Sequence, residues 1–301
     1  MNFARYPWLR DLASPAAARA IEGYRAQLFG SGVATLPGFA DAAALKGMLA
    51  EASAKSAAAY VTDDTHNAYL TAADASKPKG HLVNQFMRTR VASVAFDELS
   101  PGGDLVRLYE QQALAEVVRR ITEQDRVFHS ADPLGRCSIN VFRSGWNHAW
   151  HFDESEFTTT LMLQTAEQGG AFQFTPWIRR DRESLAEEPL EKILAGAGGA
   201  EDLYDDLAFE PGTLSIFAGR YCLHRVTETA GDRERLVAVF TFASASPSGT
   251  GLREHAGDAE ALLGPRIAGT LRGVGLGLGL GLGLGLGLGL GLGLGLGLGL
   301  G

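Results

Sequence analysis

The sequence contains only two cysteines, Cys137 and Cys222, which are too few for a disulfide framework. It also lacks a block of basic residues: 27 Lys and Arg stand against 35 Asp and Glu, for a net charge of −8. This balance argues against a nucleic-acid or anionic-membrane partner and favours a small-molecule substrate. The N-terminus has no apolar run that resembles a signal peptide, so we expect a cytoplasmic protein.

The end of the chain has an unusual composition. From Gly275 to Gly301, glycine and leucine alternate without interruption and without charge. The segment exceeds the ~18 to 20 apolar residues that span a bilayer, but glycine costs ~1 kcal/mol per residue in a helix. The same alternation suits a strand with leucine on one face. Because a perfect period is typical of low-complexity repeats, we predict one domain over 1–274, place the tail outside the fold and expect no membrane partner.

The segment from about residue 14 to 125 is predicted to be largely helical. Ser14 followed by Pro15 is a typical helix start, and Asp41 is a typical N-cap. Apolar residues at helical spacing predict helices over 15–29, 42–59 and 104–124. The polar segment from Thr62 to Lys79 is predicted to be a loop, and 33–36 a short strand.

From about residue 126 to 250 the sequence changes to short β-rich runs. A charged segment with helical spacing, 179–194, interrupts them. Many short strands at close spacing favour a sandwich or barrel over alternating β-α-β units. We therefore predict a mainly β protein in which helices pack around an antiparallel jelly-roll core. The predicted strands cover 138–142, 157–163, 171–174, 213–217, 221–226 and 235–242.

Two sequence motifs, distant from each other in the chain, contain candidate metal ligands. His151 and Asp153 are two residues apart and would project to the same face of a strand, so an imidazole and a carboxylate can reach one metal ion. A third ligand, His224, would come from a distant strand. Two histidines and one carboxylate on one side of the ion are typical of non-haem Fe(II) oxygenases. A His-x-Asp pair alone is a weak signal and is more often structural.

A basic residue adds to this pattern. Arg235, eleven residues after His224, begins the apolar strand 235–240 and would form a two-point salt bridge with a carboxylate inside the barrel. The alternative is an ordinary charge at the edge of a strand. Arg233, two residues earlier, is a second candidate for the same role.

With these residues, the sequence resembles the Fe(II)/2-oxoglutarate-dependent oxygenases. Within that superfamily it resembles the branch of radical halogenases and hydroxylases that act on free amino acids, lysine especially. The resemblance covers about 80–243 and implies a double-stranded β-helix, a cupin-like jelly roll, with Fe(II), 2-oxoglutarate and O2 as cofactor and cosubstrates. It is carried by 87–93, 140–146, 148–153 and 211–226.

The resemblance also implies roles for individual residues. His151, Asp153 and His224 would bind iron, and Arg235 would bind the far carboxylate of 2-oxoglutarate. In the halogenases of this branch a glycine or alanine stands where Asp153 stands, and chloride binds iron in its place. A carboxylate at this position implies hydroxylation of an unactivated C–H bond instead, with release of succinate and CO2.

For the substrate, the resemblance implies that His148 and Glu154 contact the amine end of an amino acid and that Arg88 contacts its carboxylate. A zwitterion needs charges of both signs, and this set offers them. Arg90 competes with Arg88, because both would lie on the same face of a strand. His148 as a structural histidine and Glu154 as a solvated turn carboxylate remain alternatives.

Three functions are therefore compared. The first is a hydroxylase of a free, basic L-amino acid. The second keeps the chemistry and changes the substrate to another small metabolite or a carrier-bound amino acid. The third is a non-catalytic metal-binding barrel, which would leave Arg235 without an anion to hold. The sequence leaves the oligomeric state open. It also departs from the family near its end, where we expect aromatic residues that close over the amino acid, yet the last tryptophan is Trp177.

Overall fold

The computed structural model describes residues 1–244. The Gly-Leu tail, and with it the membrane-anchor and strand alternatives for that segment, lies outside the described residues. Within residues 1–244, no helix combines the length and the apolar character needed to cross a bilayer.

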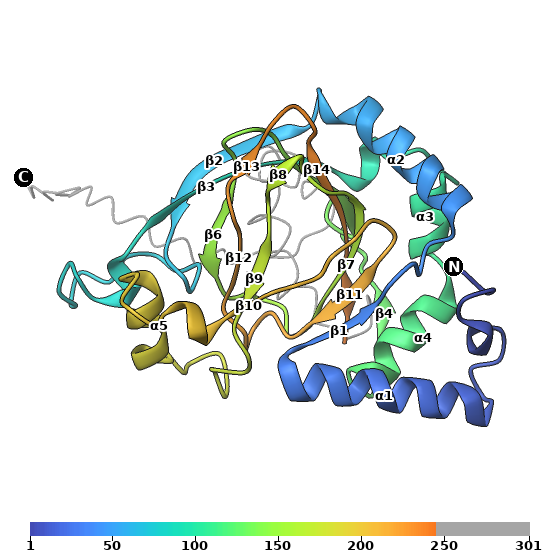
Figure 1. Cartoon of the computed structure of the whole chain (residues 1–301), viewed down its shortest axis with the longest axis horizontal. Helices are drawn as coiled ribbons and strands as arrows, with labels where there is room; N and C mark the ends of the chain where they lie inside the picture. The colour runs from blue at the N-terminus through green and yellow to red at the C-terminus, as the bar shows by residue number, and fades with distance from the viewer. Residues whose placement is uncertain (245–301) are drawn as a thin grey trace, which may run out of the picture.

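Two antiparallel sheets form the centre of the molecule (Figure 1). The large sheet has seven strands in the order β1-β11-β7-β14-β5-β3-β2, and the small sheet has four in the order β10-β9-β12-β6. Two short pairs, β13-β8 and β15-β4, extend the barrel. The predicted jelly-roll architecture is therefore confirmed. The strands are β1 (Val33–Leu36), β2 (Tyr60–His66), β3 (Met87–Val94), β4 (Phe128–His129), β5 (Cys137–Phe142), β6 (His148–His151), β7 (Thr158–Gln164), β8 (Gln168–Gly169), β9 (Phe172–Phe174), β10 (Asp205–Asp206), β11 (Leu214–Phe217), β12 (His224–Val226), β13 (Thr229–Ala230), β14 (Arg235–Phe240) and β15 (Phe242–Ala243).

Most helices lie to one side of the barrel, against the large sheet (Figure 1). The first begins as predicted, with the Ser14 side chain accepting a hydrogen bond from the Ala17 amide, and Asp41 caps the second in the same way. A separate short helix, α5, lies on the opposite side, beside the small sheet. The α-helices are α1 (Pro15–Ser31), α2 (Ala42–Ser56), α3 (Asp104–Tyr109), α4 (Gln112–Ile121) and α5 (Glu187–Leu194), and single 3-10 turns cover Pro7–Arg10, Leu82–Asn84, Phe96–Glu98 and Glu201–Leu203.

Alternation along β14 shows how the sheet separates its two faces. Leu236 and Ala238 join the apolar core between the large sheet and the helices. Arg235, Val237 and Val239 point the other way and line a cavity between the two sheets. Successive side chains of a strand point to opposite faces, so a single strand builds both the core and the cavity wall.

Two predictions about the N-terminal part were wrong. The segment predicted as a loop from Thr62 to Lys79 begins with strand residues, because β2 is an edge strand of the large sheet. Its side chains are polar because one face is exposed and the other lines the cavity, so it lacks the hydrophobic alternation of a half-buried strand. The helix predicted over 104–124 is two helices, α3 and α4, with a break at Glu110.

The division of the chain into N-terminal helices and a C-terminal jelly roll also differs from the structure. Strands β1, β2 and β3 come from the segment predicted as largely helical, and all three belong to the large sheet. They occupy its two edges: β1 pairs with β11 at one edge, and β2 and β3 follow β5 at the other. The N-terminal part therefore contributes strands that line the cavity as well as helices that pack against the large sheet.

Candidate metal centre

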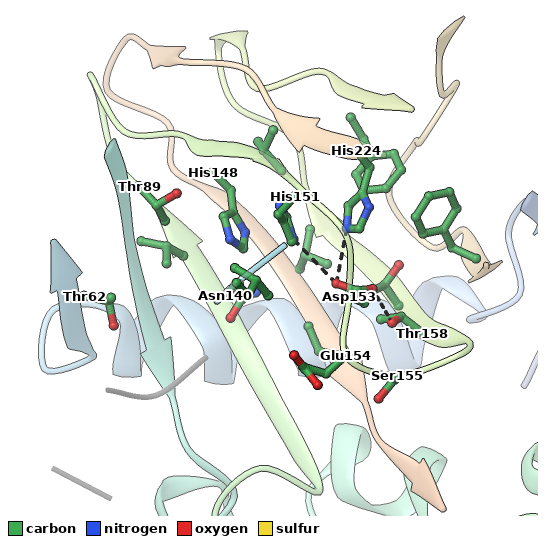
Figure 2. A pocket seen from close by; sticks show the side chains of 18 of the residues that line it. Thr62, Thr89, Asn140, His148, His151, Asp153, Glu154, Ser155, Thr158 and His224 are labelled. Atoms are coloured by element: carbon green, nitrogen blue, oxygen red, sulfur yellow. Dashed lines mark hydrogen bonds and ion pairs between the residues drawn. The ribbon is translucent and has the colours of Figure 1, made fainter. Parts of the chain in front are cut away.

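The cavity between the two sheets has a volume of about 540 Å³ and contains all three predicted metal ligands. Figure 2 shows His151 and His224 approaching from above and Asp153 below them, with the Asp153 carboxylate turned towards both rings. The three candidate ligand atoms lie within 4.8 Å of one another, an arrangement that can hold a metal ion.

Strand pairing explains why these residues meet. His151 ends β6, and His224 begins β12 directly opposite it in the antiparallel register. Asp153 lies just beyond β6 and not on the strand as predicted, and its amide donates to the Gly219 carbonyl at 3.0 Å. From there Asp153 Oδ1 is 3.5 Å from His151 Nε2 and 3.3 Å from His224 Nε2.

Hydrogen bonds orient both imidazoles for metal binding. His151 Nδ1–H donates to the Ala149 carbonyl at 2.8 Å, and His224 Nδ1–H donates to the Cys222 carbonyl at 3.0 Å. A carbonyl only accepts, so each Nδ1 carries a proton, and Nε2 of each ring is the nitrogen that faces the cavity and can bind a metal ion. Backbone contacts of this kind fix the orientation of metal-binding histidines in general.

The electrostatics of the three groups also suit a divalent cation. Burial lowers the pKa of His151 to about 4, so its ring is neutral near pH 7. Burial alone would raise the pKa of Asp153, but the two neighbouring histidines, His224 above all, outweigh it and hold the pKa well below its usual range. Two imidazoles and one carboxylate are the donor set of the facial triad that binds non-haem Fe(II).

Arg235 is a buried cation that lines the same cavity. Only 2% of it is exposed, its Nε has no hydrogen-bond partner among the described residues, and its guanidinium lies 5.3 Å from the centre of the Phe142 ring. Burial lowers its pKa from 12.5 to about 10. A buried guanidinium without an anion is costly, so Arg235 fits a carboxylate ligand.

Arg233, the second candidate, is placed differently. Its side chain is exposed and donates to the carbonyls of Thr165 and Ala166 at the surface. Of the two arginines, Arg235 alone is among the residues that line the cavity.

His148 and Glu154, two of the predicted substrate residues, line the cavity beside the triad (Figure 2). The His148 ring stacks on His151 with 3.9 Å between ring centroids. Burial, followed by the neighbouring histidines, holds the His148 pKa well below 6.5. The Glu154 carboxylate forms an ion pair with Arg182.

The structure does not bring Arg88 to the cavity, and this expectation is corrected. On β3, Thr89 and Val91 line the cavity, so alternation turns Arg88 and Arg90 to the outer face. Arg88 forms a two-point ion pair with Asp63 on β2, with both hydrogen bonds at 2.8 Å, and its side chain is 66% exposed.

His66 is a cavity residue that the sequence did not indicate. Its ring lies 5.6 Å from that of His148 and 5.8 Å from that of His151, measured between centroids. Nδ1–H donates to the Asn67 carbonyl at 3.0 Å, and Nε2 accepts from the Thr89 hydroxyl at 2.6 Å. His66 lies on β2, and a correct strand prediction there would have placed it on the face of the cavity.

Comparisons with known proteins identify the family of the chain. A family described as HalD: Halogenase D matches residues 20–259. No functionally curated protein matches the sequence.

Several solved structures are similar to the chain. AviO1 from Streptomyces viridochromogenes Tue57 is 12% identical, with 76% of this chain and 96% of AviO1 covered and a TM-score of 0.50. A 2OG-Fe(II) oxygenase family oxidoreductase from Burkholderia pseudomallei is 17% identical over 75% of this chain and 92% of its own, with a TM-score of 0.48. EctD from S. alaskensis in its apoform is 18% identical over 72% and 75%, with a TM-score of 0.49. At such identities the similarity concerns the fold alone.

Proposed function

Because the chain belongs to the halogenase D family, we propose that it is an Fe(II)- and 2-oxoglutarate-dependent oxygenase. In this proposal it hydroxylates an unactivated C–H bond of a free L-amino acid, lysine or another basic amino acid. Succinate and carbon dioxide are released in the same turnover.

One observation carries the proposal: a His-Asp-His group and an unpaired buried arginine line the same cavity. A structural metal site would explain His151, Asp153 and His224, but it gives no reason to bury Arg235 without an anion. A cosubstrate that chelates the metal at one end and carries a free carboxylate at the other end accounts for both. This favours the oxygenase over a non-catalytic metal-binding barrel.

Different residues of the chain bind the metal ion, bind the cosubstrate and exclude water. His151, Asp153 and His224 hold iron, and Arg235 binds the distal carboxylate of 2-oxoglutarate through its guanidinium fork. Bound iron supplies the redox chemistry that couples the decarboxylation of 2-oxoglutarate to oxidation of the substrate. Apolar side chains around the cavity, including Phe172, keep water from the reacting groups.

Asp153 supports hydroxylation over chlorination. Thr158 donates a hydrogen bond to Asp153 Oδ2 at 2.5 Å, while Oδ1 faces the two histidines. The carboxylate thus holds the third protein position at the metal. The family description favours chlorination as the second candidate, and that chemistry requires chloride at the place that Asp153 takes.

The charges that line the cavity support a cationic substrate. Once Asp153 is assigned to the metal and Arg235 to 2-oxoglutarate, the charged residues left on the cavity wall in the described part of the chain are Asp64 and Glu154. Both are acidic, and while Glu154 is paired with Arg182, Asp64 has no ion pair among the described residues, so a basic amino acid is favoured over an acidic one. Glu154 contacts the amine end of the substrate, with His148 beside it.

The experiment is a screen of the standard amino acids with protein that has been loaded with Fe(II) and 2-oxoglutarate without oxygen and then exposed to air in a chloride buffer. The proposal predicts that a basic amino acid stimulates succinate formation and gains one oxygen atom in the mass spectrum. A chlorinated product supports the second candidate. Binding of 2-oxoglutarate without stimulation by any amino acid moves the substrate to another metabolite or a carrier-bound amino acid.

A further inference from the structure

The charged segment after β9 reaches the edge of the cavity. Residues 179–186 precede α5, and Arg182 within them forms an ion pair with Glu154. Glu154 belongs to the cavity wall and lies next to Asp153 in Figure 2. The Arg182 side chain is 51% exposed, and the Glu154 side chain is 21% exposed. A guanidinium and a carboxylate therefore stand together at the rim, with the guanidinium on the solvent side.

Two other arginines hold this pair in place. Arg179 is 6% exposed, stacks 4.4 Å from the Phe152 ring centroid, and donates to three backbone carbonyls, including those of Arg182 and, at 3.3 Å, Arg220. Arg220 in turn donates from Nε to the Glu154 carbonyl at 3.0 Å. Side-chain hydrogen bonds thus fix the backbone at both members of the ion pair, so the rim is prearranged.

Three arginines, Arg179, Arg182 and Arg220, lie close together beside Glu154. Among residues 1–244, Glu154 is the only carboxylate that forms an ion pair with Arg179, Arg182 or Arg220. Burial lowers the pKa of Arg179, and the charges of Arg182 and Arg220 add to this effect while Tyr69 and Asp181 oppose it. A guanidinium has five donors and can serve two carboxylates at once. Arg182 can therefore bind a second anion while it stays close to Glu154.

We propose that Arg182 binds the α-carboxylate of the amino-acid substrate while Glu154 binds its α-ammonium. The inference rests on the proposed function, because it presumes an amino acid at Glu154. The two charged groups of an amino acid share one carbon atom, so they match the two members of one ion pair. Arg182 then takes the role that the sequence suggested for Arg88, which lies on the outer face of the sheet and pairs with Asp63.

The geometry also orients the substrate. With its α-carbon at the rim, the amino-acid side chain extends past Glu154 towards His151 and His224, which lie deeper in the cavity. Oxidation is therefore directed to the side chain and not to the α-carbon.

The test compares Arg182→Ala with Arg180→Ala, a matched control two residues away whose side chain is exposed. Full-length protein carrying Fe(II) and 2-oxoglutarate is titrated calorimetrically without oxygen. The ligands are L-lysine and cadaverine, which is lysine without its carboxylate. Wild type and Arg180→Ala should bind lysine more tightly than cadaverine. In Arg182→Ala the ratio of lysine affinity to cadaverine affinity should fall by about 10- to 100-fold, which is the range for the loss of one charge-assisted hydrogen bond. Unchanged 2-oxoglutarate affinity in Arg182→Ala shows that the fold is intact.

Three outcomes would overturn the assignment. An unchanged lysine-to-cadaverine ratio in Arg182→Ala means that Arg182 does not contact the carboxylate. A loss of preference in Arg88→Ala but not in Arg182→Ala returns the role to Arg88. If wild type binds neither ligand, the assignment of a basic amino acid as substrate is wrong, and the role of Arg182 is contradicted together with it. The first two outcomes leave the proposed function standing, so the two failures are distinguishable.

Discussion

Gly219 leaves the space in which the Asp153 carboxylate lies. A Cβ atom at position 219 would be 2.0 Å from Asp153 Oδ2 and 2.6 Å from its carboxyl carbon, and neither contact is tolerated. The Gly219 carbonyl also accepts the hydrogen bond from the Asp153 amide at 3.0 Å. The two residues are 66 positions apart in the chain, and the absence of a side chain at Gly219 leaves room for the Asp153 carboxylate.

Gly219→Ala should therefore weaken metal binding without unfolding the protein. The methyl group must displace the Asp153 side chain, and loss of ligand orientation typically costs about 10- to 100-fold in metal affinity. Anaerobic calorimetry with Fe(II) measures the effect. Gly198→Ala is the matched control, because a Cβ there meets no atom within 4 Å. Equal affinities of the two variants would contradict the role of Gly219.

Asp153→Gly should suppress hydroxylation and open a coordination position for chloride. The change removes the single carboxylate of the triad and leaves His151 and His224 in place. The product is identified by mass spectrometry with and without chloride in the buffer. His224→Ala should instead abolish metal-dependent turnover. Full hydroxylation by Asp153→Gly would show that Asp153 is not a ligand.

Arg235→Gln should weaken 2-oxoglutarate binding by about 10- to 100-fold, because one or two charge-assisted hydrogen bonds are lost. Arg233→Gln provides the comparison: its exposed side chain bonds only to surface carbonyls, so its 2-oxoglutarate affinity should stay near that of wild type. Calorimetry in the presence of Fe(II) separates the two. A larger loss in Arg233→Gln would reverse the assignment.

The metal-free protein should lose stability as the pH falls below 6.5. Burial lowers the pKa of His66, His148 and His151, so these rings stay neutral in the folded state while they gain protons in the unfolded chain. The unfolded state then binds more protons, and the unfolding free energy decreases with falling pH. For His151 the window runs from 6.5 to about 4, at about 1.4 kcal/mol per pH unit.

Urea unfolding at neutral pH and at about pH 5, with a chelator present, measures this slope. His151→Gln should show a shallower dependence, because an amide does not titrate. Asp153 does not contribute in this window, since its depressed pKa affects stability only below the usual carboxyl range. Stability that is independent of pH in wild type would contradict neutral buried histidines.

The sequence predicted those parts of the molecule whose signals are local. Helix caps at Ser14 and Asp41 marked the helix starts, and a continuous apolar run marked β14, with Arg235 at its beginning. The spacing of His151, Asp153 and His224 suggested one site, and the antiparallel pairing of β6 with β12 brings the two histidines together.

Other features depend on long-range contacts that spacing does not encode. β2 was missed because its inward side chains are polar residues that line the cavity and do not pack in the apolar core. Arg88 was misplaced because its orientation depends on the alternation of β3 and on an ion pair with Asp63 from another strand. The space at Gly219 and the pairing of Arg182 with Glu154 join residues that are distant in the chain.

The central claim is that this cavity couples 2-oxoglutarate and oxygen to the hydroxylation of an amino acid. The most direct measurement is a turnover experiment with isotopically labelled dioxygen in a chloride buffer, in which succinate and the product are both analysed by mass spectrometry. The account predicts one labelled oxygen atom in succinate and one in a hydroxylated basic amino acid, in equal amounts. A chlorinated product, or succinate that forms without any oxidised amino acid, would contradict it.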